Sequence, residues 1–160
     1  MKNVLFYVLI CFWPQMVYAL NADDLLSYSS RQLPGECVSK SSGLLPSIQN
    51  KQYAMDFVEC HDDKYFLLER KEFPTNNNKP DFKIFYVKPL EISNGEDFIQ
   101  HVFCSDKENT DSIVFAVGQW KMPDEYQATV DVTKAWSLNK ETLTLDEIPA
   151  ERVKCDSDGW

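Results

Sequence analysis

The chain has 160 residues and carries a net charge of −9 at pH 7, with 44% hydrophobic and 26% charged residues. This length fits one domain that can bury a real core. An acidic surface repels nucleic acid and anionic lipid, so neither is expected as a partner. The charge either keeps the protein soluble or steers it toward a cationic protein partner.

The first nineteen residues have the pattern of a removable export signal. A basic start at Lys2 precedes an apolar run at residues 4–13, and small residues stand where signal peptidase cleaves. The run is too short to span a bilayer, so no stable membrane insertion is expected. The sequence predicts a signal peptide at residues 1–19 and one mature domain at residues 20–160. The expected location is the periplasm of a Gram-negative bacterium, with secretion as the alternative.

Four cysteines lie in the predicted mature chain, and an even number in an exported protein indicates disulfides. Of three pairings, we favour Cys37 with Cys60 and Cys104 with Cys155, because each bridge then ties a terminal segment to the sheet. A zinc site is the alternative, but no pair has the Cys-x-x-Cys spacing of structural zinc. Cys11 lies in the leader, and the bulky isoleucine before it disfavours lipoprotein processing.

The N-terminal half begins with an expected helix and continues as a β-hairpin. Asn21 and the acids after it can cap a helix over residues 22–32, which a Pro-Gly pair ends. Residues 52–59 alternate apolar and polar side chains, and residues 65–68 return beside them after a polar turn. Residues 73–80 are rich in Asn and Pro, so we expect an exposed loop there.

The middle of the chain is a strand followed by an ambiguous segment. Residues 82–87 have the composition of a strand. Ser93 and Glu96 fit a capping box, and the apolar side chains of residues 98–103 share one helical face. The same residues could also form a strand. We favour a short helix.

The C-terminal half holds the expected centre of the sheet. Residues 113–117 are apolar on both faces, which is typical of a strand covered on both sides. Residues 126–138 alternate, with the even-numbered apolar side chains on one face, and residues 143–148 close the sheet. The predicted fold is α+β: an antiparallel sheet of five to seven strands with an N-terminal helix, a second short helix and two disulfides.

Signals for catalysis are weak. His61 precedes Asp62 and Asp63 in a polar turn, which allows a carboxylate-oriented general base, although solvation alone explains such a turn. His101 lies in an apolar segment, where a core histidine is commoner than a ligand. Carboxylate pairs are adjacent residues on turns and do not give the separation that glycosidases need. We therefore expect no enzyme activity, no cofactor and no metal site.

The strongest candidate for recognition is the segment after the central strand. Trp, Tyr and Met anchor protein interfaces, and acids around them suit a basic partner. The alternative is that Trp120 and Tyr126 pair across the strands and only stabilise a hairpin. The candidate partner-binding residues are Trp120, Met122, Asp124, Glu125 and Tyr126.

The C-terminal part carries a G-x-W … A-W … V-x-C pattern in the segments 118–121, 134–138, 145–148 and 153–155. This pattern resembles the C-terminal half of small exported proteobacterial proteins, many of them uncharacterised, and covers about forty-five residues. In general type the chain also resembles periplasmic immunity proteins, which neutralise toxins that attack the cell wall or membrane. The first resemblance implies shared structure and transfers no catalytic residue.

These observations favour a periplasmic immunity or inhibitor protein that binds a secreted antibacterial toxin, for example a type VI secretion effector. The partner would be a protein, such as a basic toxin or a cell-wall hydrolase. The alternatives are a small periplasmic hydrolase that uses His61 and a non-enzymatic envelope structural or stress protein. The oligomeric state stays open.

Overall fold

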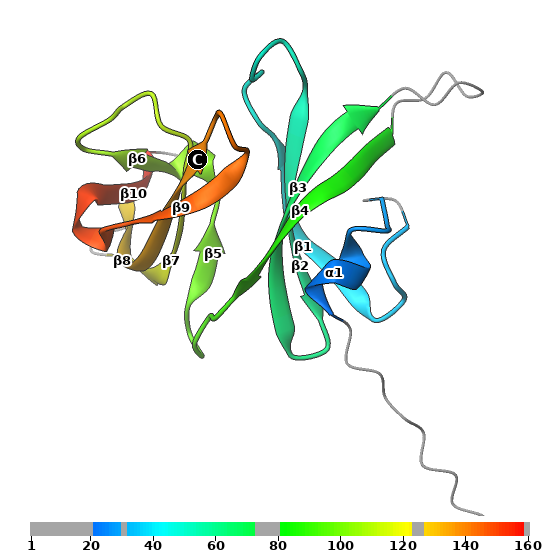
Figure 1. Ribbon diagram of the computed structural model, residues 1–160. Coiled ribbons are helices and arrows are strands. Elements are labelled where there is room, and N and C mark those ends of the chain that lie inside the picture. The colour runs from blue at the N-terminus through cyan, green and yellow to red at the C-terminus, as the bar shows by residue number, and fades with distance from the viewer. Residues whose placement is uncertain (1–20, 30–31, 73–80, 123–126, 159–160) are drawn as a thin grey trace, which may run out of the picture.

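The fold is built from two antiparallel β-sheets that pack face to face (Figure 1). The computed structural model describes residues 21–29, 32–72, 81–122 and 127–158. The first sheet has the strand order β1-β2-β3-β4. Its strands are β1 (Cys37–Leu44), β2 (Tyr53–Cys60), β3 (Asp63–Glu72) and β4 (Asp81–Leu90). β2 and β3 confirm the expected hairpin, and β4 confirms the strand expected in the middle of the chain.

The second sheet has the strand order β5-β7-β8-β10-β6, and β9 also pairs with β8. β7 pairs with both β5 and β8, which confirms its expected internal position. The elements of this half are β5 (Asp97–Ile99), η1 (His101–Phe103), β6 (Cys104–Asp106), β7 (Val114–Lys121), β8 (Gln127–Asn139), β9 (Thr144–Ile148), η2 (Ala150–Arg152) and β10 (Val153–Asp158).

The fold is therefore mostly β. The expected α+β fold was wrong in the proportion of its elements, with too few strands at five to seven and too much helix. The described residues contain ten strands and one α-helix, α1 (Ala22–Leu25). α1 has four residues and does not extend to residue 32. Ser27 donates its hydroxyl to the carbonyl of Asp24 at 2.7 Å, and Ser29 bridges to Lys83 of β4. The Ser27 hydroxyl competes for a backbone carbonyl of the helix, and the Ser29 backbone pairs with Lys83 as an isolated β-bridge, so the helix ends and the segment lies beside β4.

The second expected helix was also wrong. The capping contact does form, because Glu96 accepts a hydrogen bond from the backbone N–H of Ser93 at 2.8 Å. It closes a turn in which Gly95 has a φ of 86°, a conformation that ends a helix instead of starting one. The chain then pairs with β7 as β5 and makes one turn of 3-10 helix, η1. The capping signature was real, but no helix follows it.

The main core lies between the two sheets and is rich in aromatic rings. Phe66 of β3 packs edge-on against Phe115 of β7, with ring centroids 4.8 Å apart, and Phe57 of β2 stacks on Phe98 of β5 at 4.9 Å. Such ring pairs add to the stabilisation that burial already provides. The buried side chains that the structure describes in this core are Leu45, Ile48, Tyr53, Met55, Phe57, Phe66, Leu68, Leu90, Phe98, Ile113, Phe115, Val117, Trp136, Leu138 and Leu145.

Side chains also join the sheets along both open edges of the sandwich. Gln100 donates its amide N–H to the hydroxyl of Ser41 on β1, next to the start of η1. On the other side, Tyr86 of β4 accepts a hydrogen bond from the backbone N–H of Leu145 on β9, with 3.3 Å between the atoms. These polar contacts occupy groups at strand edges that would otherwise need another partner.

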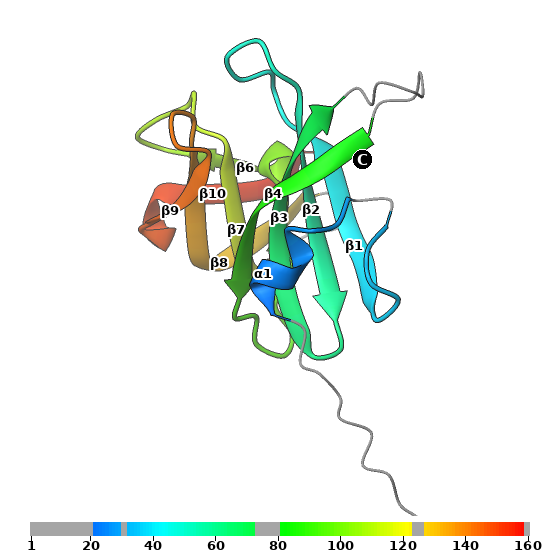
Figure 2. The same ribbon diagram turned by 45° about the vertical axis from the view of Figure 1, so that its right-hand side comes forward.

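Each sheet has a second, smaller core on the side away from the sandwich interface. α1 covers the outer face of the first sheet, and Leu25 is fully buried there (Figure 2). The second sheet encloses a cluster that includes Val114, Ala116, Ala135 and Val153.

Each of these outer cores contains one disulfide. Cys37 is bonded to Cys60, which lies directly opposite it on β2, and Cys104 on β6 is bonded to Cys155 on β10 in the same manner. This is the pairing favoured above. The zinc alternative was wrong, because all four of these thiols are consumed.

A β-bulge divides β8 into two halves. Val132 lies opposite Gly118, but Lys134 lies opposite Val117, so Thr133 is an extra residue in β8. The bulge reverses which side chains face which core: Val132 packs in the outer core, whereas Trp136 packs between the sheets. The single apolar face expected for residues 126–138 was therefore wrong, because one inserted residue exchanges the two faces.

Replacing Gly118 by alanine should destabilise the protein strongly. A Cβ atom at this position would lie 2.3 Å from the carbonyl oxygen of Asp131 and 2.7 Å from the Val130 side chain, so the bulge would have to open. Overpacking of this kind costs roughly 1–3 kcal/mol, which urea denaturation can measure. Gly35→Ala is the control, because nothing lies within 4 Å of its Cβ position. Equal effects of the two substitutions would contradict this account of the bulge.

Candidate functional site

Exposed apolar side chains lie near the outer end of β7 and in η1. Met122, directly after β7, is 78% exposed, Val102 of η1 is 65% exposed and Trp120 is 37% exposed. The rings of Phe103 and Trp120 meet edge to face, with centroids 6.2 Å apart. We call these four residues, Val102, Phe103, Trp120 and Met122, the hairpin surface.

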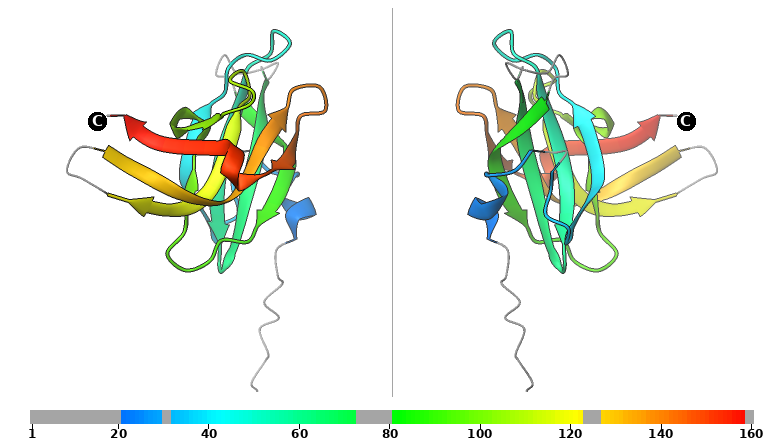
Figure 3. Two further views of the ribbon diagram at one scale, coloured as in Figure 1. Left: turned by 90° about the vertical axis from the view of Figure 1, so that its left-hand side faces the viewer. Right: turned by 90° about the vertical axis from the view of Figure 1, so that its right-hand side faces the viewer.

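The strand pattern explains why Trp120 is only partly covered. It lies on the same face of β7 as Val114 and Ala116, which are fully buried in the outer core of the second sheet. β7 and β8 continue past the part of the sheet that β5 and β9 cover, and their far ends project from the molecule together with β10 (Figure 3). Trp120 therefore extends that core to a place where less of the chain remains to bury it.

The structure places two of the five predicted binding residues. Trp120 and Met122 are both exposed, as a binding role requires. Asp124, Glu125 and Tyr126 lie outside the described residues, and so does the alternative pairing of Trp120 with Tyr126.

The residue directly opposite Trp120 on β8 is Val130. Sequence reasoning missed the contribution of η1. The apolar Val102-Phe103 pair before Cys104 was assigned to a helix, and only the turn of η1 brings Phe103 against Trp120.

One ion pair of the described residues lies beside the hairpin surface. Lys121 lies 2.8 Å from the carboxylate of Asp131 across β7 and β8, and both side chains are more than 60% exposed. An ion pair so open to water contributes about 0–1 kcal/mol.

A second candidate site holds two buried carboxylates. Asp56 of β2 and Glu69 of β3 are each 3% exposed and line a cavity of about 330 Å³ on the outer face of the first sheet. Asp56 accepts a hydrogen bond from the hydroxyl of Ser39 at 2.7 Å. Burial raises the pKa of Asp56 to about 6, although the bonds from Ser39 and from the Phe57 backbone oppose the shift. An acid held near neutrality can exchange a proton under ordinary conditions.

Sequence reasoning placed Asp56 on a polar face and did not select Glu69. Asp56 gave a signal because it interrupts an otherwise apolar stretch, whereas Glu69 begins the charged run at residues 69–72 and gave none. Only the paired sheet shows that both are covered.

The two histidines lie far apart in the fold. His61 is exposed in the β2–β3 turn with a φ of 56°, and its neighbours Asp62 and Asp63 line a different cavity of about 390 Å³. His101 packs edge-on against Phe115 at 5.8 Å, and burial lowers its pKa. The structure brings no second histidine to either ring.

Within the described residues, no group of three or more His, Cys, Asp or Glu side chains is arranged to hold a metal ion. In the same ranges, no helix has both the length and the apolar character needed to cross a bilayer. No protein-family model, no curated protein and no solved structure matches this chain significantly.

Replacing Asp56 by asparagine should stabilise the protein above about pH 6. Folding raises the pKa of Asp56 from 3.8 to about 6, so the folded state binds this proton more tightly than the unfolded chain. The free energy of unfolding therefore falls as pH rises between these values, by about 3 kcal/mol for this group. Asp56→Asn removes this dependence, so the gain should grow from pH 4 to pH 7 in urea denaturation.

Asp106→Asn is a control of opposite sign. Hydrogen bonds from Arg152, with 2.6 Å between Nη2 and Oδ2, lower the pKa of Asp106. This carboxylate stabilises the fold above its unfolded pKa, and that contribution is lost as pH falls below it. Asp106→Asn should therefore destabilise at neutral pH and lose its effect in acid. A pH-independent difference for Asp56→Asn would contradict the shift.

Proposed function

We propose that this chain is an exported, non-enzymatic binding protein that inhibits a protein partner, as a periplasmic immunity protein does for a toxin acting on the cell wall or membrane. The observation that carries the proposal is the hairpin surface, where Trp120, Met122 and Val102 are exposed and Trp120 meets the ring of Phe103. The two disulfides fit an oxidising compartment.

The inhibitor would act by covering its partner. The ring of Trp120 packs against Phe103, and Trp120 lies opposite Val130 on the neighbouring strand. Because the ring is already held on one side, little side-chain freedom is lost when its open side becomes buried. Met122 is longer and more flexible, and it can adapt to the shape of the surface it meets. A few buried anchors of this kind supply most of the binding energy in protein interfaces. The net charge of −9 favours a basic partner.

Replacing both Trp120 and Met122 by alanine should remove binding without unfolding the protein. The test is capture of a partner from a periplasmic extract on the immobilised protein, followed by titration of the purified partner. Loss of anchor residues typically weakens binding by about 2 kcal/mol or more, roughly a thirtyfold rise in Kd.

The matched control is the pair Val38→Ala and Leu44→Ala, two apolar side chains of β1 that are 56% and 62% exposed. They should leave capture unchanged. Equal loss in both double variants, or in neither, would refute the assignment of binding to the hairpin surface.

Association with the purified partner should slow as salt is added. The acidic protein would attract a basic partner over distances that ions screen, with a Debye length of about 10 Å at 0.1 M salt. Stopped-flow rates between about 0.02 and 0.5 M salt should fall steeply, while the dissociation rate changes little. An association rate that is independent of salt would remove the argument from charge and leave the apolar anchors as the basis of recognition.

A further inference from the structure

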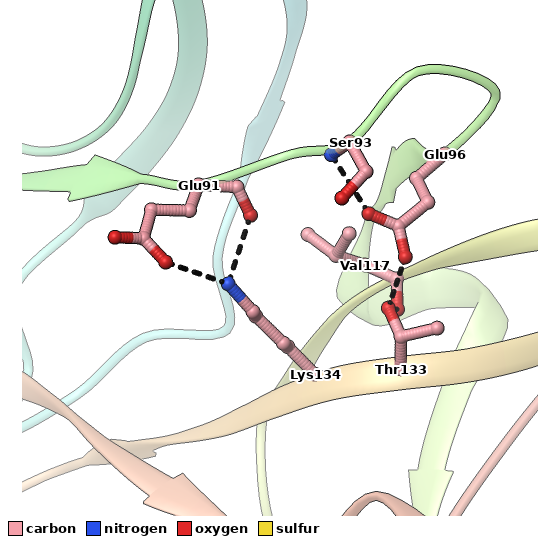
Figure 4. A network of polar contacts seen from close by, with 6 residues as sticks. All are labelled: Glu91, Ser93, Glu96, Val117, Thr133 and Lys134. Carbon is pink, nitrogen blue, oxygen red and sulfur yellow. Dashed lines mark hydrogen bonds and ion pairs between the residues drawn. The ribbon is translucent and has the colours of Figure 1, made fainter.

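A polar network joins the connection between the two sheets to the bulge in β8 (Figure 4). Thr133 donates its hydroxyl to a carboxylate oxygen of Glu96 at 2.7 Å, and the other oxygen of Glu96 accepts the backbone N–H of Ser93 at 2.8 Å. Lys134 reaches back to Glu91, with 3.2 Å to the carbonyl oxygen and 3.1 Å to the carboxylate. Residues 91–96 link β4 to β5, so both contacts hold the same crossover segment.

Thr133 is the residue that the bulge inserts. The strand register gives it no partner on β7, and its hydroxyl lies 3.1 Å from the carbonyl oxygen of Val117, where the register shifts. A bulge leaves an unpaired residue and bends the strand. The hydroxyl of Thr133 has one proton, which is directed at the nearer acceptor, the carboxylate of Glu96, with the carbonyl of Val117 as a second, longer contact. The side chain therefore links the bulge to Glu96. Its hydrogen bond also contributes to the lowered pKa of Glu96, which keeps this carboxylate charged over a wider range.

The bulge separates two parts of the β7–β8 ribbon. On the inner side, Phe115 and Trp136 lie opposite each other and are buried between the sheets. On the outer side, residues 118–121 pair with residues 129–132 and carry Trp120 away from the sandwich (Figure 3). We call residues 118–121 and 129–132 the arm. In the described residues, the arm is held within its own sheet, where Thr129 pairs with Asp156 of β10 and Trp120 meets Phe103. The ring pair that joins this ribbon to the first sheet, Phe66 with Phe115, lies on the inner side of the bulge.

We propose that the Glu96–Thr133 contact is a latch that fixes the direction of the arm, and that it thereby presents Trp120 to the partner. Thr133 and Glu96 are positioning residues, since neither belongs to the hairpin surface. The fixed direction of the arm follows from the contacts alone, whereas the presentation of Trp120 to a partner rests on the proposed function.

Backbone hydrogen exchange of the full chain, measured by NMR, tests the latch. Thr133→Val keeps the shape of the side chain and removes the hydroxyl, so exchange in the arm should rise by roughly two- to tenfold, the effect of losing one hydrogen bond. Exchange in β2 and β3 should not change. Thr133→Ser restores the hydroxyl and should restore protection, and Thr129→Val, on the same strand outside the bulge, should leave the arm protected.

Coupling between the two residues gives an independent measurement. If Glu96 acts through Thr133, the two substitutions should not be additive. The exchange rate of the arm in the double variant Glu96→Ala with Thr133→Val should rise by less than the product of the two single increases. Uniform acceleration across both sheets, no acceleration, or a serine variant that behaves like valine would overturn the latch.

Capture of the partner then separates the two proposals. Thr133→Val should weaken capture two- to tenfold, and Thr133→Ser should not. Faster exchange in the arm with unchanged capture would overturn the presentation of Trp120 while the latch stands. Unchanged capture by the Trp120 and Met122 variant as well would refute the proposed function instead.

Discussion

The whole structure depends on burying β7 on both faces. Phe115 and Val117 point into the aromatic core between the sheets, and Val114 and Ala116 point into the outer core of the second sheet. β7 is thus shared by two cores, and packing on each of its faces fixes which residues face the other core. The buried part of β7 ends at Gly118, where close approach of the β8 backbone leaves no room for a side chain. Beyond that point the ribbon is only partly covered: Val130 and Val132 pack against the outer core, whereas Trp120 and Met122 are exposed.

Much of the framework could be predicted from local pattern. A continuous apolar run identified β7, and alternation around a polar turn identified β2 and β3, because both signals depend on residues near in sequence. The helix expected at residues 22–32 failed for a tertiary reason: Ser29 finds a bridge to Lys83, far along the chain. The bulge at Thr133 left a weak signal, because the polar pair Thr133-Lys134 breaks the alternation, but this break alone does not show that the register shifts.

The candidate sites were predictable only in part. Trp120 and Met122 could be selected because Trp and Met near an expected hairpin turn are side chains that anchor protein interfaces. Phe103 could not, since its contact with Trp120 depends on the path of η1 between two strands. Asp56 was expected on the polar face of its strand because it alternates with apolar neighbours. Its outward direction was correct, but the cover over that face comes from parts of the chain far away in sequence.

The disulfides have a mechanical consequence that follows from their placement. Cys37–Cys60 laces two strands of the first sheet, and Cys104–Cys155 laces two strands of the second. Neither crosses from one sheet to the other. A force that pulls the two sheets apart is therefore resisted by ring packing and a few edge contacts, while a disulfide holds two strands together within each sheet. Under mechanical load the two sheets should separate from each other before the disulfide-linked strands within either sheet come apart.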